Sequence, residues 1–188
     1  IGFLRKLFEL EVPEIASGDV KIKNIARDAG NRAKVAVYTD RPNVDAIGAC
    51  VGNRGTRINT IVNELNGEKI DLVEYSDDPL EYIARALSPA KVLSVETNDS
   101  LNMSQVIVPD DKLSLAIGKG GQNVRLAAKL TGWKIDVKPE SYIKPAKSSE
   151  ETEDVEYELT ELSDDNSFDT MSDLEELEPI DGDEFPEI

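Results

Sequence analysis

Residues 51–58 read VGNRGTRI, and 66 positions later residues 117–124 read IGKGGQNV. In each stretch an aliphatic residue leads into a Gly-x-x-Gly turn that contains a basic residue, and a helical pattern follows directly. Because glycine has no Cβ, it permits a tight turn and lets backbone N–H groups approach an anion closely. The helix that follows adds the positive end of its dipole. Each stretch therefore predicts a loop that holds phosphate.

The residues around the two turns indicate that a longer segment is duplicated. Asp45 and Ile58 align with Asp111 and Val124 at the same offset of 66 positions. After one residue drops out, the run KID at residues 69–71 aligns with the same run at residues 134–136. A repeat of about 65 residues is too long for a solenoid unit and suits a duplicated small domain.

Hydrophobic periodicity predicts the elements of the first copy. Apolar residues between positions 3 and 8 fall at helical spacing, and Pro13 ends that segment. Alternating residues on both sides of a turn at 27–31 predict two antiparallel strands. A short helix precedes the glycine loop, a second helix follows it and ends at Asn66-Gly67, and a third strand comes last.

The second copy repeats this order of helix, strand, strand, helix, loop, helix and strand. Its first helix begins after a capping sequence, SDDP at residues 76–79, with proline at the first helical position. Strands are expected at residues 92–95 and 106–108, and a final strand at residues 133–137. Because the connection between the copies is mostly one helix, we expect the two loops to keep a fixed relative orientation.

Residue types needed for catalysis are scarce. The sequence has no histidine and a single cysteine, Cys50, so Cys50 is expected to be a small buried core residue. The loops lack the Gly-x-x-x-x-Gly-Lys spacing of a Walker A loop, and no Gly-x-Gly-x-x-Gly follows a strand. We therefore expect no enzymatic activity, no metal and no cofactor.

The sequence also indicates the cellular compartment of the protein. One cysteine cannot form a disulfide within the chain, which suits a reducing cytosol. No apolar run approaches membrane-spanning length and no signal peptide is visible, so we expect a cytoplasmic protein without membrane contact. The chain begins with Ile1 and has no methionine before Met103, which suggests a fragment.

A helix, a Gly-x-x-Gly loop and a second helix with three strands resemble the KH domain, whose loop clamps about four nucleotides of single-stranded nucleic acid. Because a strand pair precedes each loop and one strand follows it, the order is similar to the bacterial type II KH domain. Longer segments resemble the tandem KH region of the NusA family of bacterial transcription elongation and termination factors. These segments are LRKLFELEVPEI (4–15), GACVG (48–52), VNEL (62–65), LSPAKV (87–92), LSLAIGK (113–119) and LTGWKID (130–136).

The resemblance implies an α+β fold and a role in RNA binding. It places a first KH domain at residues 1–75 and a second at residues 76–146, and the composition of residues 147–188 predicts a disordered acidic tail after them. The implied partner is single-stranded nascent RNA emerging from RNA polymerase, with a part in pausing, termination and antitermination. The family also has a polymerase-binding domain and an S1 domain, neither visible in this sequence, so RNA polymerase is expected as a partner of the full-length protein.

Each loop is expected to hold the sugar-phosphate backbone, with Arg54 or Lys119 neutralising phosphate and the bases turned towards a neighbouring groove. Ile58 and Val124 fit either that groove or the core, whereas Arg57 and Arg125 fit either RNA contact or a solvated helix surface. Two loops in a fixed orientation predict one continuous site of at least about eight nucleotides. The candidate RNA-binding residues are Val51, Gly52, Asn53, Arg54, Gly55, Arg57 and Ile58 in the first copy, and Ile117, Gly118, Lys119, Gly120, Gly121, Val124 and Arg125 in the second.

The charge of the chain is concentrated in its last segment. The net charge is −17, and residues 147–188 carry the whole excess because they contain eighteen acidic residues and one lysine. Their low apolar content predicts disorder. Within them, four apolar residues recur every third position and could form a short helix on a partner or remain unstructured. These four are Phe168, Met171, Leu174 and Leu177.

The role of the acidic tail and the class of function each leave an alternative open. The tail could compete with RNA for the basic loops as an intramolecular contact, or it could dock on a basic protein. A second class of function is a protein-interaction scaffold in which the KH pair is structural and the tail is the working part. The basic residues inside both loops favour RNA binding over the scaffold.

Overall fold

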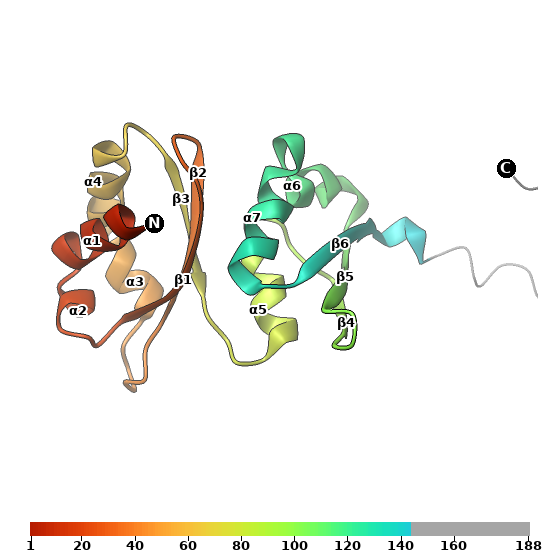
Figure 1. Cartoon of the computed structure of the whole chain (residues 1–188), viewed down its shortest axis with the longest axis horizontal. Coiled ribbons are helices and arrows are strands. Elements are labelled where there is room, and N and C mark those ends of the chain that lie inside the picture. The colour runs from red at the N-terminus through yellow and green to blue at the C-terminus, as the bar shows by residue number, and fades with distance from the viewer. Residues whose placement is uncertain (144–188) are drawn as a thin grey trace, which may run out of the picture. The chain divides into compact units, whose positions relative to one another are not determined.

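The chain begins with a helix whose apolar side chains share one face. In the computed structural model, which describes residues 1–143, this helix is α1 (Gly2–Glu11), and it buries Leu4, Leu7 and Phe8 (Figure 1). Phe3 falls outside this stripe and is 59% exposed. Pro13 does more than end the segment, because it is also the first residue of a second short helix, α2 (Pro13–Ala16). Proline is accepted there because the first N–H of a helix has no intrahelical partner.

The first sheet is mixed and has three strands in the order β1-β2-β3. Strand β1 (Lys21–Asp28) pairs antiparallel with β2 (Arg32–Tyr38), and β2 pairs parallel with β3 (Lys69–Glu74). The turn expected at residues 27–31 is shorter than predicted, since Arg27 and Asp28 still pair within the ladder.

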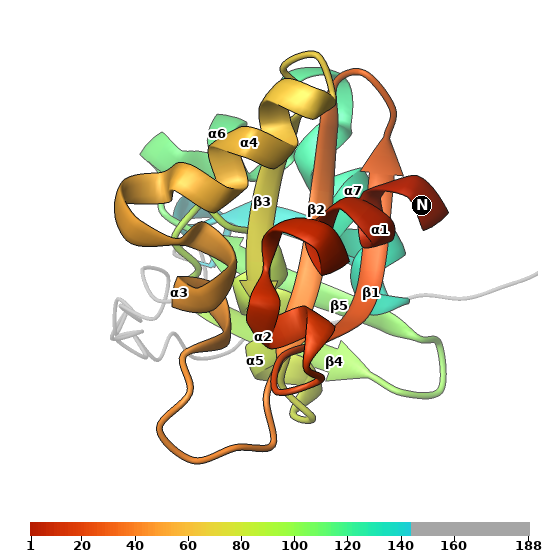
Figure 2. The same ribbon diagram turned by 90° about the vertical axis from the view of Figure 1, so that its left-hand side faces the viewer.

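Two helices on either side of the first glycine loop make the crossover from β2 to β3. They are α3 (Ala46–Val51), capped by the Asp45 carboxylate that accepts a hydrogen bond from the Gly48 N–H at 2.9 Å, and α4 (Thr56–Glu64). Figure 2 shows α1, α3 and α4 in front of the three strands. Cys50 lies in the core between these layers, and burial raises the pKa of its thiol to about 12. The expectation that Cys50 is a small buried core residue is confirmed.

The second domain repeats the order of the first without a counterpart of α2. Helix α5 (Pro79–Ala86) begins where predicted, and the Asp78 carboxylate accepts the Leu80 N–H at 3.0 Å. Strand β4 (Ser94–Asn98) pairs antiparallel with β5 (Met103–Val108), which pairs parallel with β6 (Lys134–Pro139). The remaining helices are α6 (Leu113–Ile117) and α7 (Gln122–Thr131), which flank the second glycine loop.

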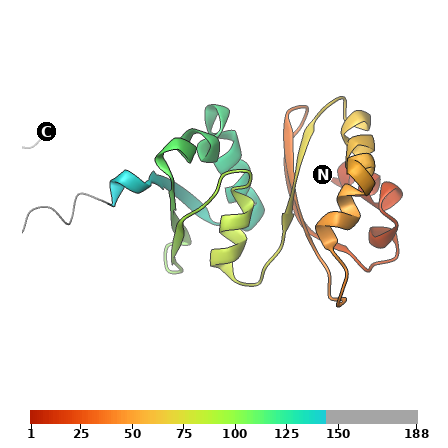
Figure 3. The same cartoon turned by 180° about the vertical axis from the view of Figure 1, so that it is seen from behind.

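The two domains share a hydrophobic core. Ala26, Ala36 and Val73 face away from the first core and pack in one cluster with residues of α5 and α7, such as Ile83 and Leu126. In Figures 1 and 3, α1 to α4 lie on one face of the first sheet, and α5 and α7 lie on the other. The second domain therefore uses the first sheet as one wall of its own core.

Two further predictions concern the acidic tail and membrane contact. The acidic tail expected at residues 147–188, with its apolar residues, lies outside the described residues. None of the helices between residues 1 and 143 has the length and hydrophobicity of a membrane-spanning helix.

Candidate nucleic-acid interface

The first Gly-x-x-Gly loop joins α3 to α4 through one 3-10 turn, Asn53–Gly55. Gly52 has φ 74° and ψ 175°, and a Cβ added there would lie 2.7 Å from Cγ of Arg57. Both this conformation and this close approach require glycine. Gly55 closes the turn by donating its N–H to the Gly52 carbonyl at 3.1 Å.

The second loop has the same backbone conformation. Gly118 has φ 77° and ψ 170°, and a Cβ there would lie 2.8 Å from the backbone nitrogen of Asn123. The Gly121 N–H donates to the Gly118 carbonyl at 3.1 Å, as in the first loop. Gly120 and Gly121 also have positive φ, but an added Cβ would meet nothing within 4 Å. Crowding therefore restricts the first glycine, and conformation alone restricts the others.

Each loop presents one exposed cation, at different positions. Arg54 is the second residue between the glycines of the first loop, whereas Lys119 is the first residue between those of the second loop. Arg54 itself adopts a left-handed conformation with φ 53°, which Gly120 adopts in the second loop. Within residues 1–143 neither cation forms an ion pair, so both charges are available to a bound anion.

Arg57 has a structural role in addition to the two alternatives, RNA contact or a solvated helix surface, that its sequence position predicts. Its Nη1 donates to Oε2 of Glu14 at 2.9 Å and to the Ala49 carbonyl at 2.7 Å. Its side-chain stem packs beneath Gly52. The guanidinium group therefore ties α2 and α3 to the start of α4 and supports the loop from below.

Asn123 is the counterpart of Arg57 in the repeat, and it was not among the candidate residues. It is buried, and its Nδ2 donates to the carbonyls of Leu87 at 3.0 Å and Ala116 at 2.9 Å. The alignment that pairs Ile58 with Val124 also pairs Arg57 with Asn123, so the repeat contained the signal for a supporting side chain at this position.

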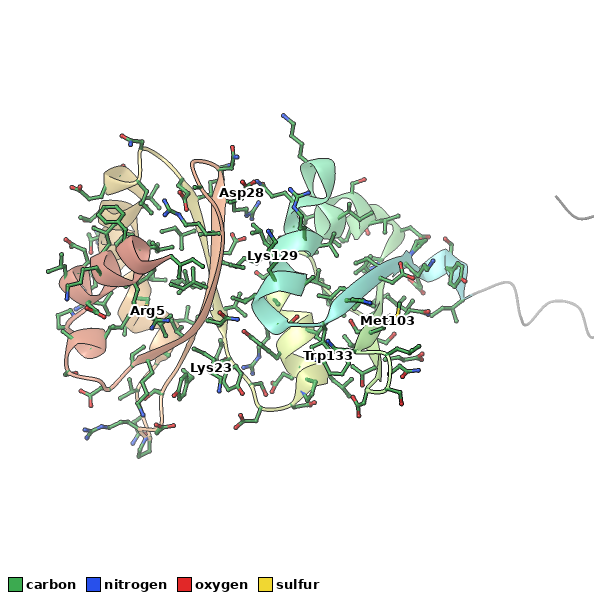
Figure 4. All side chains as sticks on the ribbon, in the orientation of Figure 1. Arg5, Lys23, Asp28, Met103, Lys129 and Trp133 are labelled. Atoms are coloured by element: carbon green, nitrogen blue, oxygen red, sulfur yellow. The ribbon has the colours of Figure 1, made fainter. Side chains whose placement is uncertain are left out.

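Arg125 lies beside the second loop and close to the first domain. Its Nη1 donates to the Gly120 carbonyl at 3.3 Å. Nearby, Gln122 Nε2 donates to Asp28 Oδ2 at 2.7 Å, which lowers the pKa of Asp28, and the charges of Arg125 and Lys129 lower it further. Figure 4 labels Asp28 on the first domain and Lys129 on α7. The hairpin of the first domain thus holds the beginning of α7, where the second loop ends.

The four aliphatic candidates are all half-buried, which leaves both roles open to them. Ile58 packs against the first core and Val124 against the second. Val51 and Ile117 end the helices that lead into the loops. The part of each side chain outside the core is accessible to a ligand.

An open groove of about 360 Å³ runs from the first domain to the second. Ile47 of α3 and Leu72 and Glu74 of β3 line its first part, and Arg85 and Ser88 at the end of α5 line the rest. Arg85 is held by ion pairs to Glu74 at 3.0 Å and to Glu81 at 2.5 Å. Periodicity within one copy cannot reveal this groove, because its walls come from both copies.

Two domains with this strand order and this helix-loop-helix geometry form a tandem KH protein. The sequence matches the NusA-like first KH domain over residues 1–75 and the NusA-like second KH domain over residues 79–145. The chain belongs to the NusA family. The family resemblance and the α+β tandem KH fold inferred from the sequence are therefore confirmed.

Two similar proteins carry the same name. The transcription termination/antitermination protein NusA of Halalkalibacterium halodurans is 63% identical over 140 residues, which cover 74% of this chain and 37% of that protein. The protein of the same name from Bacillus subtilis is 61% identical over 140 residues, covering 74% of this chain and 38% of that protein. The chain thus spans well under half the length of these relatives. The crystal structure of APE1850 aligns with a TM-score of 0.53 and 25% identity, covering 72% of this chain and 95% of that one.

Proposed function

We propose that the two KH domains bind single-stranded RNA as one continuous site, within a transcription elongation, termination and antitermination factor that acts on nascent RNA at bacterial RNA polymerase. The observation that carries this proposal is the pair of Gly-x-x-Gly loops with one backbone conformation, each with one exposed cation that forms no ion pair within residues 1–143. KH loops of this type clamp about four nucleotides of backbone.

The groove that joins the domains supports a path for the strand between the loops. Ile47 and Leu72 provide apolar surface for bases, and Arg85 adds a cation at the crossing. Because Arg85 already pairs with Glu74 and Glu81, an incoming phosphate has to compete with two carboxylates. We therefore expect this part of the path to contribute less affinity than the loops.

Each domain alone is expected to bind weakly, because each loop offers one exposed cation. Joining two sites in one chain raises the overall affinity by about 10²- to 10⁴-fold when both are engaged at once. The shared core of the two domains favours such engagement, since it fixes one sheet against α5 and α7.

The test is a titration of fluorescent single-stranded RNA of about 12 nucleotides with the full chain and with a variant carrying Lys119→Asp and Gly120→Asp. We expect the variant to bind at least about tenfold more weakly, because two carboxylates would face the phosphate. An added side chain at Gly120 has open space, and Asp tolerates left-handed backbone better than most residues, so the variant should fold.

A matched control carries the same change of charge on the outer face of the second sheet, as Lys134→Asp with Ser94→Asp. Both positions are exposed. Circular dichroism checks that all three proteins are folded. Equal weakening by the variant and the control, or absence of binding by the parent, would contradict the proposal.

The remaining features of the proposal come from the family. We propose that RNA polymerase is a partner of the full-length protein, that the protein works in the cytoplasm without membrane contact, and that it has no enzymatic activity. Deletion of residues 147–188 tests whether the acidic segment contacts the RNA site, since an intramolecular competitor would lower RNA affinity in the full chain and change its salt dependence.

A further inference from the structure

Two consecutive carbonyl groups at the end of α5 connect the first domain to the second loop. Because α5 ends at Ala86, the carbonyls of Leu87 and Ser88 have no partner within the helix, and the Leu87 carbonyl accepts the Ala90 N–H at 3.1 Å. Lys34 of the first domain donates from Nζ to the Ser88 carbonyl at 2.7 Å. Asn123, beneath the second loop, donates from Nδ2 to the Leu87 carbonyl at 3.0 Å.

Lys34 is held rigidly at its end of this connection. It lies on the central strand β2, is fully buried, and donates to Asp71 Oδ2 at 3.0 Å. Asp71 is itself fixed by two hydrogen bonds from Arg32, at 2.7 and 2.9 Å. Burial lowers the pKa of Lys34, and the Asp71 carboxylate opposes that shift. A buried ammonium group needs its hydrogen-bond partners, so the Ser88 carbonyl cannot move away without cost.

Asn123 is held as closely at the other end. Its Nδ2 also donates to the Ala116 carbonyl of α6 at 2.9 Å, on the helix that enters the second loop. Its backbone nitrogen and Cβ lie directly against Gly118, the first glycine of that loop. A shift of the Leu87 carbonyl would therefore displace Asn123 and reach the loop.

The first loop has no equivalent connection among its supporting contacts. Arg57, the counterpart of Asn123, bonds to Ala49 and Glu14, which both belong to the first domain. Support of the second loop, in contrast, passes through α5 to the sheet of its neighbour.

We propose that Lys34 is a positioning residue that, through the end of α5 and Asn123, sets the second Gly-x-x-Gly loop relative to the first domain for RNA binding. This inference rests on the proposed RNA-binding function. Lys34 does not touch RNA, since it is buried. Its removal releases the Ser88 carbonyl and leaves both loops chemically intact.

The test uses the full chain with Lys34→Met, which keeps the length of the side chain and removes the ammonium group. Asp71 retains its two hydrogen bonds from Arg32, so no carboxylate is left unpaired. The control is Lys69→Met, which removes one positive charge from an exposed position on the neighbouring strand β3.

The first readout is RNA affinity as a function of RNA length. Lys34→Met should weaken binding of an RNA of about 12 nucleotides by roughly tenfold or more, because the second site is no longer aligned with the first. Binding of an RNA of about four nucleotides by the first loop should stay within about twofold of the parent, because so short a strand occupies one site only and does not depend on the alignment of the two loops. Lys69→Met should not change the ratio of the two affinities.

The second readout is independent of RNA. In nuclear magnetic resonance spectra of the free protein, the amide signals of Gly118, Gly120 and Gly121 should shift in Lys34→Met, while those of Gly52 and Gly55 should not. Parent-like affinities, equal losses for long and short RNA, or unchanged second-loop amides would each overturn the proposal. If the parent bound no RNA, the proposed function would fail, and the amide signals alone would decide whether Lys34 positions the loop.

Discussion

At the scale of single residues, the first domain depends on a buried carboxylate. Glu68 is 1% exposed and accepts hydrogen bonds from Nε and Nη2 of Arg27, at 2.7 and 2.8 Å, and from the Gly30 N–H at 2.9 Å. These bonds join the β1–β2 turn to the residue that precedes β3. The Arg27 hydrogen bonds lower the pKa of Glu68, and the Gly30 N–H adds to that effect.

This lowered pKa predicts how stability responds to acid. A carboxylate whose pKa is lower in the folded than in the unfolded state stabilises the fold fully above the unfolded value and loses that contribution as pH falls. The loss should begin near the ordinary pKa of 4.5 and continue towards the lower folded value. Urea unfolding of the parent and of Glu68→Gln between about pH 3 and pH 7 measures it. The stability difference between the two should shrink as pH falls; a constant difference would contradict the assignment.

Some residues of the candidate site could be predicted from the sequence, and others could not. Arg54 and Lys119 were identifiable because an exposed cation between two glycines has few other uses. The structural role of Arg57 was not identifiable, because its partner Glu14 lies 43 positions away. Which side chains neutralise a charge is decided by tertiary packing, and periodicity carries no information about it.

At the scale of elements, the glycines of the second loop differ in how tightly each is constrained. Gly118→Ala should lower the free energy of unfolding by about 2 to 4 kcal/mol, because its backbone conformation is nearly exclusive to glycine and the new Cβ would crowd Asn123. Gly120→Ala is the matched control, with positive φ and open space, and should cost about 1 to 2 kcal/mol. Chemical denaturation followed by circular dichroism compares them. Equal costs would mean that crowding by Asn123 is unimportant.

Most helices and strands could be predicted because each buries one face and therefore has a regular apolar period. The exceptions arise where one residue or short apolar run is compatible with two different local structures. Pro13 was taken as a stop, but it also starts α2. The strand expected at residues 92–95 begins only at Ser94. Val92 and Leu93 precede β4 without belonging to it, and Leu93 is 47% exposed although it is apolar.

At the scale of the whole molecule, the outer faces of the two sheets differ. On the first sheet, Ala36 is paired in register with Val73, and both pack against the second domain. On the second sheet, the equivalent pair is Ile107 with Lys138, and the neighbouring pair is Gln105 with Asp136. Small apolar residues let helices approach a sheet closely, whereas charged residues favour water. The first outer face is thus suited to carry a domain, and the second is suited to solvent.

The shared core could not be read from the sequence. Ala26 and Ala36 lie on the face of their strands that a single domain would expose to solvent, and alanine is common on surfaces as well as in cores. Periodicity within each copy identifies the inner face of each sheet. Only the placement of α5 and α7 against the first sheet shows that its outer face is also buried.

The shared core predicts that the two domains unfold together. Val73→Ala lies in the first domain, yet it removes apolar contacts from the core of the second, at an expected cost of about 1 to 3 kcal/mol. The single tryptophan, Trp133, lies in the second domain and lines a pocket with Lys23 and Asn24 of the first, so its fluorescence reports on the second domain and on its contact with the first. Unfolding of Val73→Ala in urea should therefore shift the Trp133 transition and the circular-dichroism transition to the same lower midpoint.

A second substitution separates a shared core from general weakening. Val35→Ala removes the same two methyl groups from the first core only. If the domains unfold as one unit, it should also move the Trp133 transition, because loss of the first domain exposes Ala36 and Val73 together with the surfaces of α5 and α7 that cover them. A Trp133 transition that stayed at the parent midpoint in Val35→Ala, while circular dichroism shifted, would mean that the second domain stands without the first sheet. In that case the second loop would keep its shape independently of the first domain, and the affinity for long RNA would depend on the loops alone.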